Sequence, residues 1–217
     1  MLKVLRAGLI SLGVLVLPVY LLLVRRWYLH WGVTGAERRQ SMPGDEQVHH
    51  PRLETTRAIT IEAPPAMIWP WLVQMGYRRG GWYTYDRLDN GGMPSATYII
   101  AELQNIKVGD IIPTGPGGGF TVTEVKPDQS LVMALHTASE TGTGADMSTA
   151  CVLLPLDAEH TRLFVRQRVD FKPHLREIIY YLLFDPGDFL MTRKMLRGIK
   201  ERAERSSRAT AVVPAIS

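Results

Sequence analysis

The run from Ala7 to Val24 constrains this chain more than any other segment, because it is uncharged and almost wholly apolar. As an α-helix it would be about 27 Å long at roughly 1.5 Å per residue, close to the about 30 Å thickness of a bilayer core. A cleaved signal peptide usually has a shorter apolar region followed at once by small residues, whereas Arg25, Arg26 and Trp27 follow here. The sequence therefore predicts one transmembrane helix, with a signal peptide or a buried core helix as alternatives.

The residues after this run have the composition of a membrane interface. Arg25 and Arg26 can extend toward lipid headgroups, and Trp27, Tyr28 and Trp31 are typical of the aromatic belt beside a span. Slightly more positive charge follows the run than precedes it, which favours a cytoplasmic location for the rest of the chain. We therefore expect single-pass attachment to a membrane, with the membrane as a partner.

Beyond this run, the chain has the organisation of a single domain. We expect an anchor at residues 1–31 with its span at about 7–24, a polar juxtamembrane linker at 32–53, a domain at 54–205 and a disordered tail at 206–217. A stretch as long as the expected domain can bury a core of its own.

Charge is distributed unevenly along the chain. The net charge is +4, yet residues 1–40 carry +5 and residues 193–208 another +5, which leaves the body acidic at −6. An acidic body argues against nucleic acid as a partner. The single cysteine, Cys151, excludes an intramolecular disulfide, and because it lies in an apolar run we expect it to be buried.

Alternation of polar and apolar residues predicts a strand at 55–63. Apolar residues at helical spacing after Pro65 predict a helix at 66–75, and a short helix is expected at 95–103. Five further strand-like runs, separated by turn residues, are expected at 108–114, 120–125, 131–136, 148–156 and 161–171. Such close spacing favours an antiparallel meander. The glycine-rich segment 115–119 is interpreted as a hairpin turn, because no helix follows it to cradle a phosphate.

The strand expected at 161–171 has one polar residue on its apolar face. Leu163, Val165, Val169 and Phe171 share that face with Gln167. An unpaired buried amide costs on the order of 1–3 kcal/mol. Gln167 is therefore predicted to have a hydrogen-bonding partner.

The C-terminal region is predicted to be helical in two parts. A very apolar helix is expected at 173–184, and segment 185–188 (DPGD) is expected to end it and to cap a second helix. The second helix has one apolar face formed by Phe189, Thr192, Leu196, Ile199 and Ala203.

The segment 81–90, GWYTYDRLDN, is the strongest candidate for a functional site. Its three aromatic residues offer apolar surface with polar tips. A carboxylate in an apolar pocket has a raised pKa and can act as a general acid or base, so Asp86 and Asp89 are candidate catalytic residues. The alternative is an ordered loop in which Asp86 accepts backbone N–H bonds and the rings pack on the first helix.

Metal and nucleophile motifs are not found in the sequence. No histidine pair has zinc-ligand spacing, and no nucleophile elbow or Ser-His-acid arrangement is visible. We expect no metal and no cofactor.

Three segments carry a resemblance to a known superfamily: residues 56–90 (TRAITIEAPPAMIWPWLVQMGYRRGGWYTYDRLDN), 102–120 (ELQNIKVGDIIPTGPGGGF) and 191–204 (MTRKMLRGIKERAE). They resemble the SRPBCC superfamily, which includes START lipid-transfer domains, birch-pollen-allergen-like proteins and polyketide cyclase/dehydrase-like proteins. The likeness runs from about Trp27 to Arg205 and is closest to a bacterial subgroup with an N-terminal membrane anchor. It implies an α+β helix-grip fold, in which a curved antiparallel sheet wraps a long C-terminal helix. It also implies localisation at the bacterial inner or plasma membrane.

The resemblance further implies an elongated apolar cavity between the sheet and the C-terminal helix. Its lining would come from the inner sheet face, the aromatic segment and the helix. The implied ligand-binding residues are Trp82, Tyr83, Tyr85, Met133, Leu135, Leu163, Val165, Gln167, Phe189, Thr192 and Leu196. A large, mostly apolar pocket suits a lipid or another hydrophobic small molecule.

We therefore expect membrane-anchored binding, with transfer as an extension of it, of a lipid or hydrophobic small molecule. One alternative is a cyclase-, dehydratase- or hydrolase-like enzyme that uses Asp86 or Asp89 as general acid or base. Another is a protein-interaction module whose cavity is collapsed.

Overall fold

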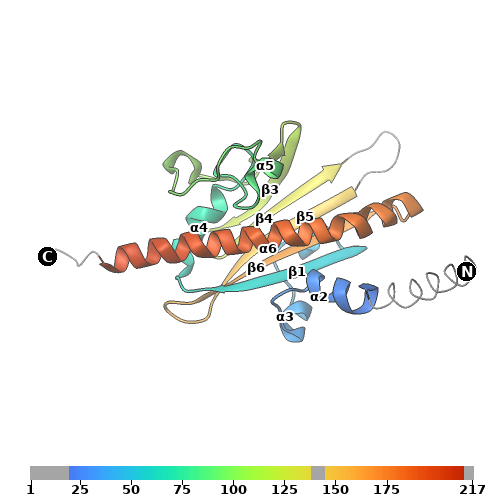
Figure 1. Cartoon of the computed structure of the whole chain (residues 1–217), viewed down its shortest axis with the longest axis horizontal. Helices are drawn as coiled ribbons and strands as arrows, with labels where there is room; N and C mark the ends of the chain where they lie inside the picture. Colours follow the sequence, from blue (N-terminus) through green and yellow to red (C-terminus); the bar gives the residue numbers. More distant parts are fainter. Residues whose placement is uncertain (1–19, 138–144, 213–217) are drawn as a thin grey trace, which may run out of the picture.

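The computed structural model describes residues 20–137 and 145–212 (Figure 1). Its centre is an antiparallel six-stranded sheet in the order β1-β6-β5-β4-β3-β2, so that the last strand pairs with the first. The strands are β1 (Leu53–Ile61), β2 (Ile111–Gly115), β3 (Gly118–Lys126), β4 (Ser130–Thr137), β5 (Ala145–Pro155) and β6 (Thr161–Phe171). The predicted meander is confirmed, and the glycine-rich segment forms the β2–β3 hairpin, where Gly118 has a φ of +135°.

A single long helix, α6 (Leu175–Val212), lies across one face of the sheet (Figure 1). The predicted α+β helix-grip class is therefore confirmed. The predicted break at 185–188 is wrong, because α6 runs through Pro186 without interruption. Residues on both sides of Pro186 are held by tertiary ion pairs, Asp185 to Arg25 and Asp188 to Arg57, each at 2.6 Å. These contacts keep a helix where the local sequence favours an end.

The remaining helices are short. Helix α4 (Pro65–Val73) fulfils the expectation for 66–75, whereas the helix expected at 95–103 is reduced to the 3₁₀ turn η3. The other elements are η1 (Tyr20–Val24), α2 (Arg25–Leu29), α3 (Gly35–Arg39), η2 (Asp45–Gln47), α5 (Asp86–Asp89) and η3 (Ala101–Leu103).

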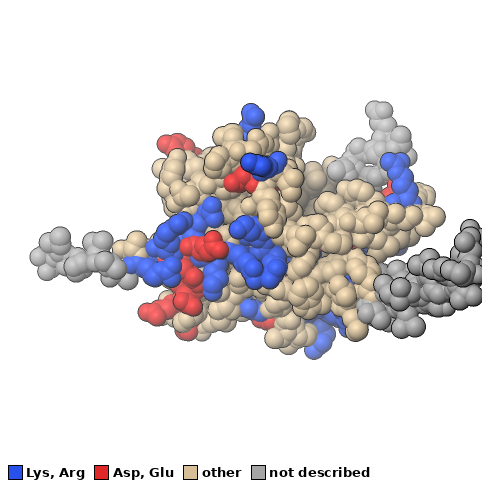
Figure 2. Space-filling model, in the orientation of Figure 1, with Lys and Arg blue, Asp and Glu red and all other residues tan. Residues whose placement is uncertain are grey.

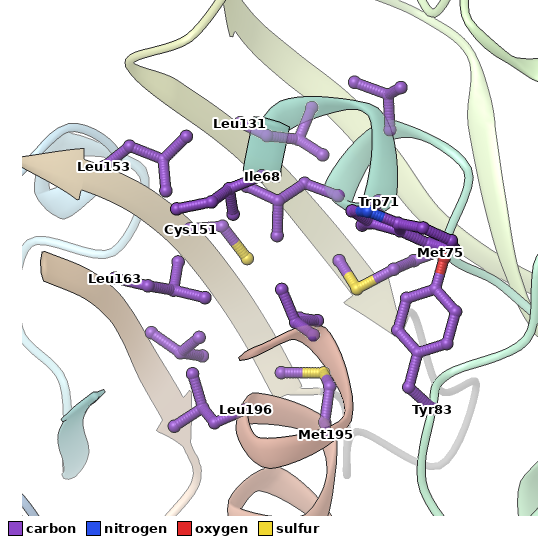
Figure 3. Packing of buried hydrophobic residues seen from close by; sticks show 14 of the residues in the cluster. Ile68, Trp71, Met75, Tyr83, Leu131, Cys151, Leu153, Leu163, Met195 and Leu196 are labelled. Carbon is purple, nitrogen blue, oxygen red and sulfur yellow. Dashed lines mark hydrogen bonds between the residues drawn. The ribbon is translucent and has the colours of Figure 1, made fainter. Parts of the chain in front are cut away.

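The main hydrophobic core lies between the sheet, α4 and the central part of α6 (Figure 3). Trp71 from α4 and Leu196 from α6 share this core with Leu131, Cys151 and Leu163 from the strands. All five are buried, and Cys151 is buried as expected. Burial raises the pKa of the Cys151 thiol to about 12, which keeps it protonated.

The segment predicted as a polar linker, 32–53, packs against the domain. Met42 is buried with Ala58 and Phe164 on the face of the sheet opposite α6. Arg166 of β6 bonds the Asp45 carboxylate at 2.9 Å. An arginine on the face of β6 opposite α6 therefore binds the segment 32–53. Alternation alone predicts that such an arginine faces solvent.

The predicted membrane anchor requires a correction. Most of the span expected at 7–24 lies outside the described residues, which begin at Tyr20. No helix in the described part of the chain is both long enough and apolar enough to cross a bilayer. This finding contradicts the predicted single-pass localisation at the bacterial inner or plasma membrane, and the predicted membrane partner is left without support.

Three of the residues expected at a membrane interface, Arg25, Tyr28 and Trp31, pack on the domain. The rings of Tyr28 and Trp31 lie 5.7 and 6.4 Å from the Phe189 ring of α6. Arg25 binds a buried carboxylate of the same helix. A sequence pattern cannot separate these two roles, because aromatic and basic residues serve equally well at a protein interface.

Candidate functional site

A cavity of about 390 Å³ lies between the N-terminal half of α6 and the adjoining part of the sheet. Four strands and the helix contribute to it, and most of its surface is apolar. The lining residues are Leu53, Thr55, Leu135, Ala145, Met147, Gln167, Val169, Phe171, Arg176, Glu177, Tyr180, Tyr181, Phe184, Asp185 and Asp188. We call this cavity the α6 pocket.

The strand register explains where the pocket is apolar. Leu135, Met147, Val169 and Leu53 stand opposite one another across β4, β5, β6 and β1, so they form one row under the helix. Toward the open end the ring of Phe171 stacks on Tyr181 of α6, with ring centroids 4.3 Å apart. The sequence forms this surface because every second residue of each strand faces the helix.

The next row toward the core contains polar residues. Thr149, Gln167 and Thr55 are direct cross-strand neighbours on β5, β6 and β1, and we call them the polar row. The Thr55 hydroxyl lies 3.4 Å from the Gln167 amide. With its amide nitrogen turned to the helix, Gln167 donates to the Asp188 carboxylate at 3.2 Å. The prediction that Gln167 has a partner is confirmed.

A buried ion pair lies beside the polar row. The Arg57 side chain is fully buried, and its Nη1 donates to Asp188 at 2.6 Å and to Thr192 at 2.9 Å. Its Nε donates to the Tyr28 carbonyl at 3.0 Å. These bonds join β1, α2 and α6 at one guanidinium, so the inner end of the pocket is held from three sides.

A second ion pair borders the pocket at Asp185, whose side chain is 2% exposed. Burial raises the pKa of this carboxyl, and the bonds from Arg25 at 2.6 and 3.0 Å act in the opposite direction. Both bonds go to Oδ2, so Arg25 does not engage Oδ1. Asp185 and Asp188 are thus the aspartates of the pocket, each paired with an arginine.

The structure divides the predicted ligand-binding residues among several places. Leu135 and Gln167 line the α6 pocket. Met133, Leu163, Val165 and Leu196 are buried in the main core, Phe189 packs in a second cluster with Tyr28, and Thr192 binds Arg57. All of these sheet residues lie under α6 as expected, but the core fills most of that space.

The aromatic segment lies away from the α6 pocket. The Tyr83 hydroxyl donates to the Trp71 carbonyl at 3.0 Å, and burial raises its pKa. Trp82 packs against the main core, and Tyr85 is exposed. None of the three is among the described residues that line the pocket.

The two candidate catalytic carboxyls also lie outside the pocket. Asp86 accepts bonds from the Ser95 hydroxyl at 2.5 Å and the Ser95 backbone N–H at 3.0 Å. Asp89 binds the Thr84 hydroxyl, and burial raises the pKa of Asp89. Such bonds fit the ordered-loop alternative, and a catalytic role for either residue stays a prediction.

Sequence reasoning did not select Arg57, Asp185, Asp188 or Thr55. For Arg57 a signal was present, since it has the same alternation as Ile59 and Ile61 and so an arginine falls on an apolar face. The sequence pattern instead indicates Asp185 as the N-cap of a second helix and Asp188 as a residue of its first turn. Across the described ranges, no group of three His, Cys, Asp or Glu side chains could hold a metal ion.

Comparisons with known proteins give only distant likenesses. No family model matches the chain, and no curated protein matches it. Among solved structures, the Mesorhizobium loti protein MLL2253 is 17% identical, with a TM-score of 0.43 over 69% of this chain and 98% of its own.

Two of the similar structures come with printed functional contexts. The Zhui aromatase/cyclase of a Streptomyces species is 13% identical, with a TM-score of 0.38 over 74% of this chain and 99% of its own. DynU16, a protein of the dynemicin biosynthetic locus, is 16% identical, with a TM-score of 0.41 over 66% of this chain and 46% of its own. Likenesses this distant carry no argument about substrate or reaction, so the fold rests on the sheet and helix described above.

Proposed function

We propose that this protein binds a hydrophobic small molecule or lipid in the α6 pocket. The observation that carries the proposal is the pocket itself, about 390 Å³ in volume and lined mainly by apolar side chains of four strands and one helix. Specific ligand sites have these properties: concave, largely apolar and supplied with a few placed polar groups. An open pocket of this size also argues against the alternative of a collapsed cavity.

The pairing of the two pocket aspartates, Asp185 and Asp188, favours binding over catalysis. Each aspartate in the pocket is held by an arginine at 2.6 Å. A general acid or base must exchange a proton with its substrate, whereas both of these carboxylates are already engaged by arginine side chains. Catalysis by Asp86 or Asp89 would require a substrate outside the α6 pocket.

The proposal is tested by filling the pocket. Naphthalene, an apolar molecule small enough for the cavity, is measured by equilibrium dialysis against the full chain. Met147→Trp places a large ring on the pocket lining and is expected to weaken naphthalene binding at least about tenfold.

Leu154→Trp is the matched control, because Leu154 lies on the same strand, is 43% exposed and is not part of the pocket lining. It is expected to bind naphthalene as the unchanged protein does. Equal binding by all three proteins, or no binding by the unchanged protein, would contradict the proposal.

A further inference from the structure

The wall that α6 contributes to the pocket carries more negative than positive charge. Its charged lining residues are three carboxylates and one guanidinium: Glu177, Asp185, Asp188 and Arg176. Glu177 and Asp185 are eight residues apart on the helix, with Tyr181 midway between them. Side chains four residues apart lie on the same helix face, so these three form one line along the pocket wall.

Glu177 is the carboxylate of this wall that lacks a counter-charge. Asp185 and Asp188 are paired with Arg25 and Arg57, each at 2.6 Å. Within the described ranges no basic side chain forms an ion pair with Glu177. The residue is half-buried, and its Oε2 has no hydrogen-bond partner. A partly buried carboxylate without a partner is stabilised by a cation placed close to it.

Arg176 lines the pocket as well, but it does not neutralise Glu177. It is exposed, so water and salt screen its charge. Adjacent positions on a helix do not face each other, and the two side chains form no ion pair in the described structure. A ligand carboxylate would therefore gain little from Arg176 and would be repelled by Glu177.

Four aromatic rings line the pocket near the same end of α6: Phe171, Tyr180, Tyr181 and Phe184. The Tyr181 ring stacks on Phe171 at 4.3 Å between centroids, and the Tyr180 ring lies 5.1 Å from that of Tyr181. Tyr180 also stacks on Phe184 at 5.6 Å. Aromatic rings attract cations, and clusters of them are used to bind quaternary ammonium groups.

The electrostatic surroundings of Tyr181 have the sign that a cation requires. Burial raises the pKa of the Tyr181 hydroxyl, and Tyr180, Asp185 and Glu177 raise it further. Each of these three groups is negative when ionised, so they disfavour another negative charge at this ring. The same groups stabilise a positive charge at this place.

We propose that the α6 pocket takes a hydrophobic organic cation, a small molecule whose apolar body carries one amino or quaternary ammonium group. The cationic group binds beside Glu177 and the aromatic rings, and the apolar body lies along Leu135 and Met147 of the sheet. The cavity of about 390 Å³ is within the range of small-molecule sites, roughly 300–1,000 Å³. The inference rests on the proposed function and adds to it the charge of the ligand and the residue that recognises it.

The test compares naphthalenes that differ in charge. Naphthalene, 2-neopentylnaphthalene, (2-naphthylmethyl)trimethylammonium and 2-naphthoate are measured by equilibrium dialysis against the full chain near pH 7. The neopentyl and trimethylammonium compounds have nearly the same shape, so they differ mainly in charge. The cation is expected to bind about fivefold tighter than its neutral isostere, because contacts of a cation with rings and a carboxylate have a modest net value. The anion 2-naphthoate is expected to bind more weakly than naphthalene.

Variants assign the preference to Glu177. Glu177→Gln removes the charge at nearly constant shape and is expected to abolish the preference for the cation, while the neutral isostere binds as before. Glu177→Asp keeps the charge and is expected to retain part of the preference. Arg176→Gln removes a like charge and is expected to tighten binding of the cation.

Glu201→Gln is the matched control. Glu201 is an exposed residue of the same helix and is not part of the pocket lining. The variant changes the net charge by the same amount as Glu177→Gln, so a preference that depends on Glu177 itself is expected to remain.

The outcomes separate this inference from the proposed function. If naphthalene binds and the cation binds no tighter than its neutral isostere, the ligand charge is refuted and the pocket survives. Tightest binding by 2-naphthoate also refutes it, as does an equal preference for the cation in Glu177→Gln and Glu201→Gln. If no naphthalene compound binds, the proposed function itself fails.

Discussion

At the residue scale, Arg57 is the side chain with the most consequences. Its side chain is fully buried and pairs with Asp188. Its guanidinium carbon lies 5.6 Å from the centroid of the Phe189 ring. Arg57→Met leaves the carboxylate without its counter-charge and is expected to destabilise the protein by about 3–5 kcal/mol. Chemical denaturation measures the free energy of unfolding.

The double variant Arg57→Met/Asp188→Leu removes both charges. Because no unpaired charge remains, it is expected to recover at least about 1 kcal/mol relative to Arg57→Met. A single variant as stable as the unchanged protein would show that this pair does not hold the inner end of the pocket.

His30 gives a pH dependence with a definite sign. Burial is the largest cause that lowers its pKa, from 6.5 to about 4, and Arg38 and Arg26 add to the effect. Between those values the unfolded chain binds a proton that the folded chain does not. The free energy of unfolding is therefore expected to fall as pH is lowered from about 6.5 to about 4.

His30→Gln removes this contribution and is expected to give a flatter pH profile over the same range. Titration of the His30 ring followed by NMR measures the pKa directly. Identical profiles for the two proteins, or a ring that titrates near 6.5, would contradict the expectation.

At the element scale, α6 is the decisive feature. Its two central glycines lie in different surroundings: a Cβ on Gly187 would meet nothing within 4 Å, whereas one on Gly198 would lie 2.6 Å from the Tyr83 carbonyl oxygen. Gly187→Ala is expected to stabilise the protein by roughly 0.5–1 kcal/mol through helix propensity. Gly198→Ala makes the same chemical change but must displace the backbone at Tyr83, so it is expected to destabilise.

Thermal unfolding of the two variants compares these effects. Stabilisation by both would contradict the close contact at Gly198. Destabilisation by Gly187→Ala would contradict a continuous helix through Pro186.

Much of the element pattern could be predicted from the sequence, because alternation and turn residues are local signals. Strand β6 has the expected bounds, and Gln167 has the expected need for a partner. The continuity of α6 could not be predicted, since it depends on Arg25 and Arg57, which are remote in sequence. The packing of segment 32–53 has the same origin, in contacts such as Asp45 with Arg166.

At the scale of the whole molecule, charge and apolar surface separate along α6. Basic side chains gather over its C-terminal half, while the surface over its N-terminal half is largely uncharged (Figure 2). The C-terminal half packs on the closed core, and the N-terminal half covers the pocket. The alternation along each strand indicates which residues face α6. Only the structure shows which of those residues pack in the core and which line the pocket.

The central claim is that the α6 pocket binds an apolar molecule, and the most direct test locates such a molecule on the full chain. Methionine methyl groups are isotope-labelled, and NOEs from bound naphthalene are recorded. Met147 lines the pocket, while Met195 lies in the main core. The account predicts NOEs to the Met147 methyl and none to that of Met195; saturable binding with no NOE to Met147 would contradict it.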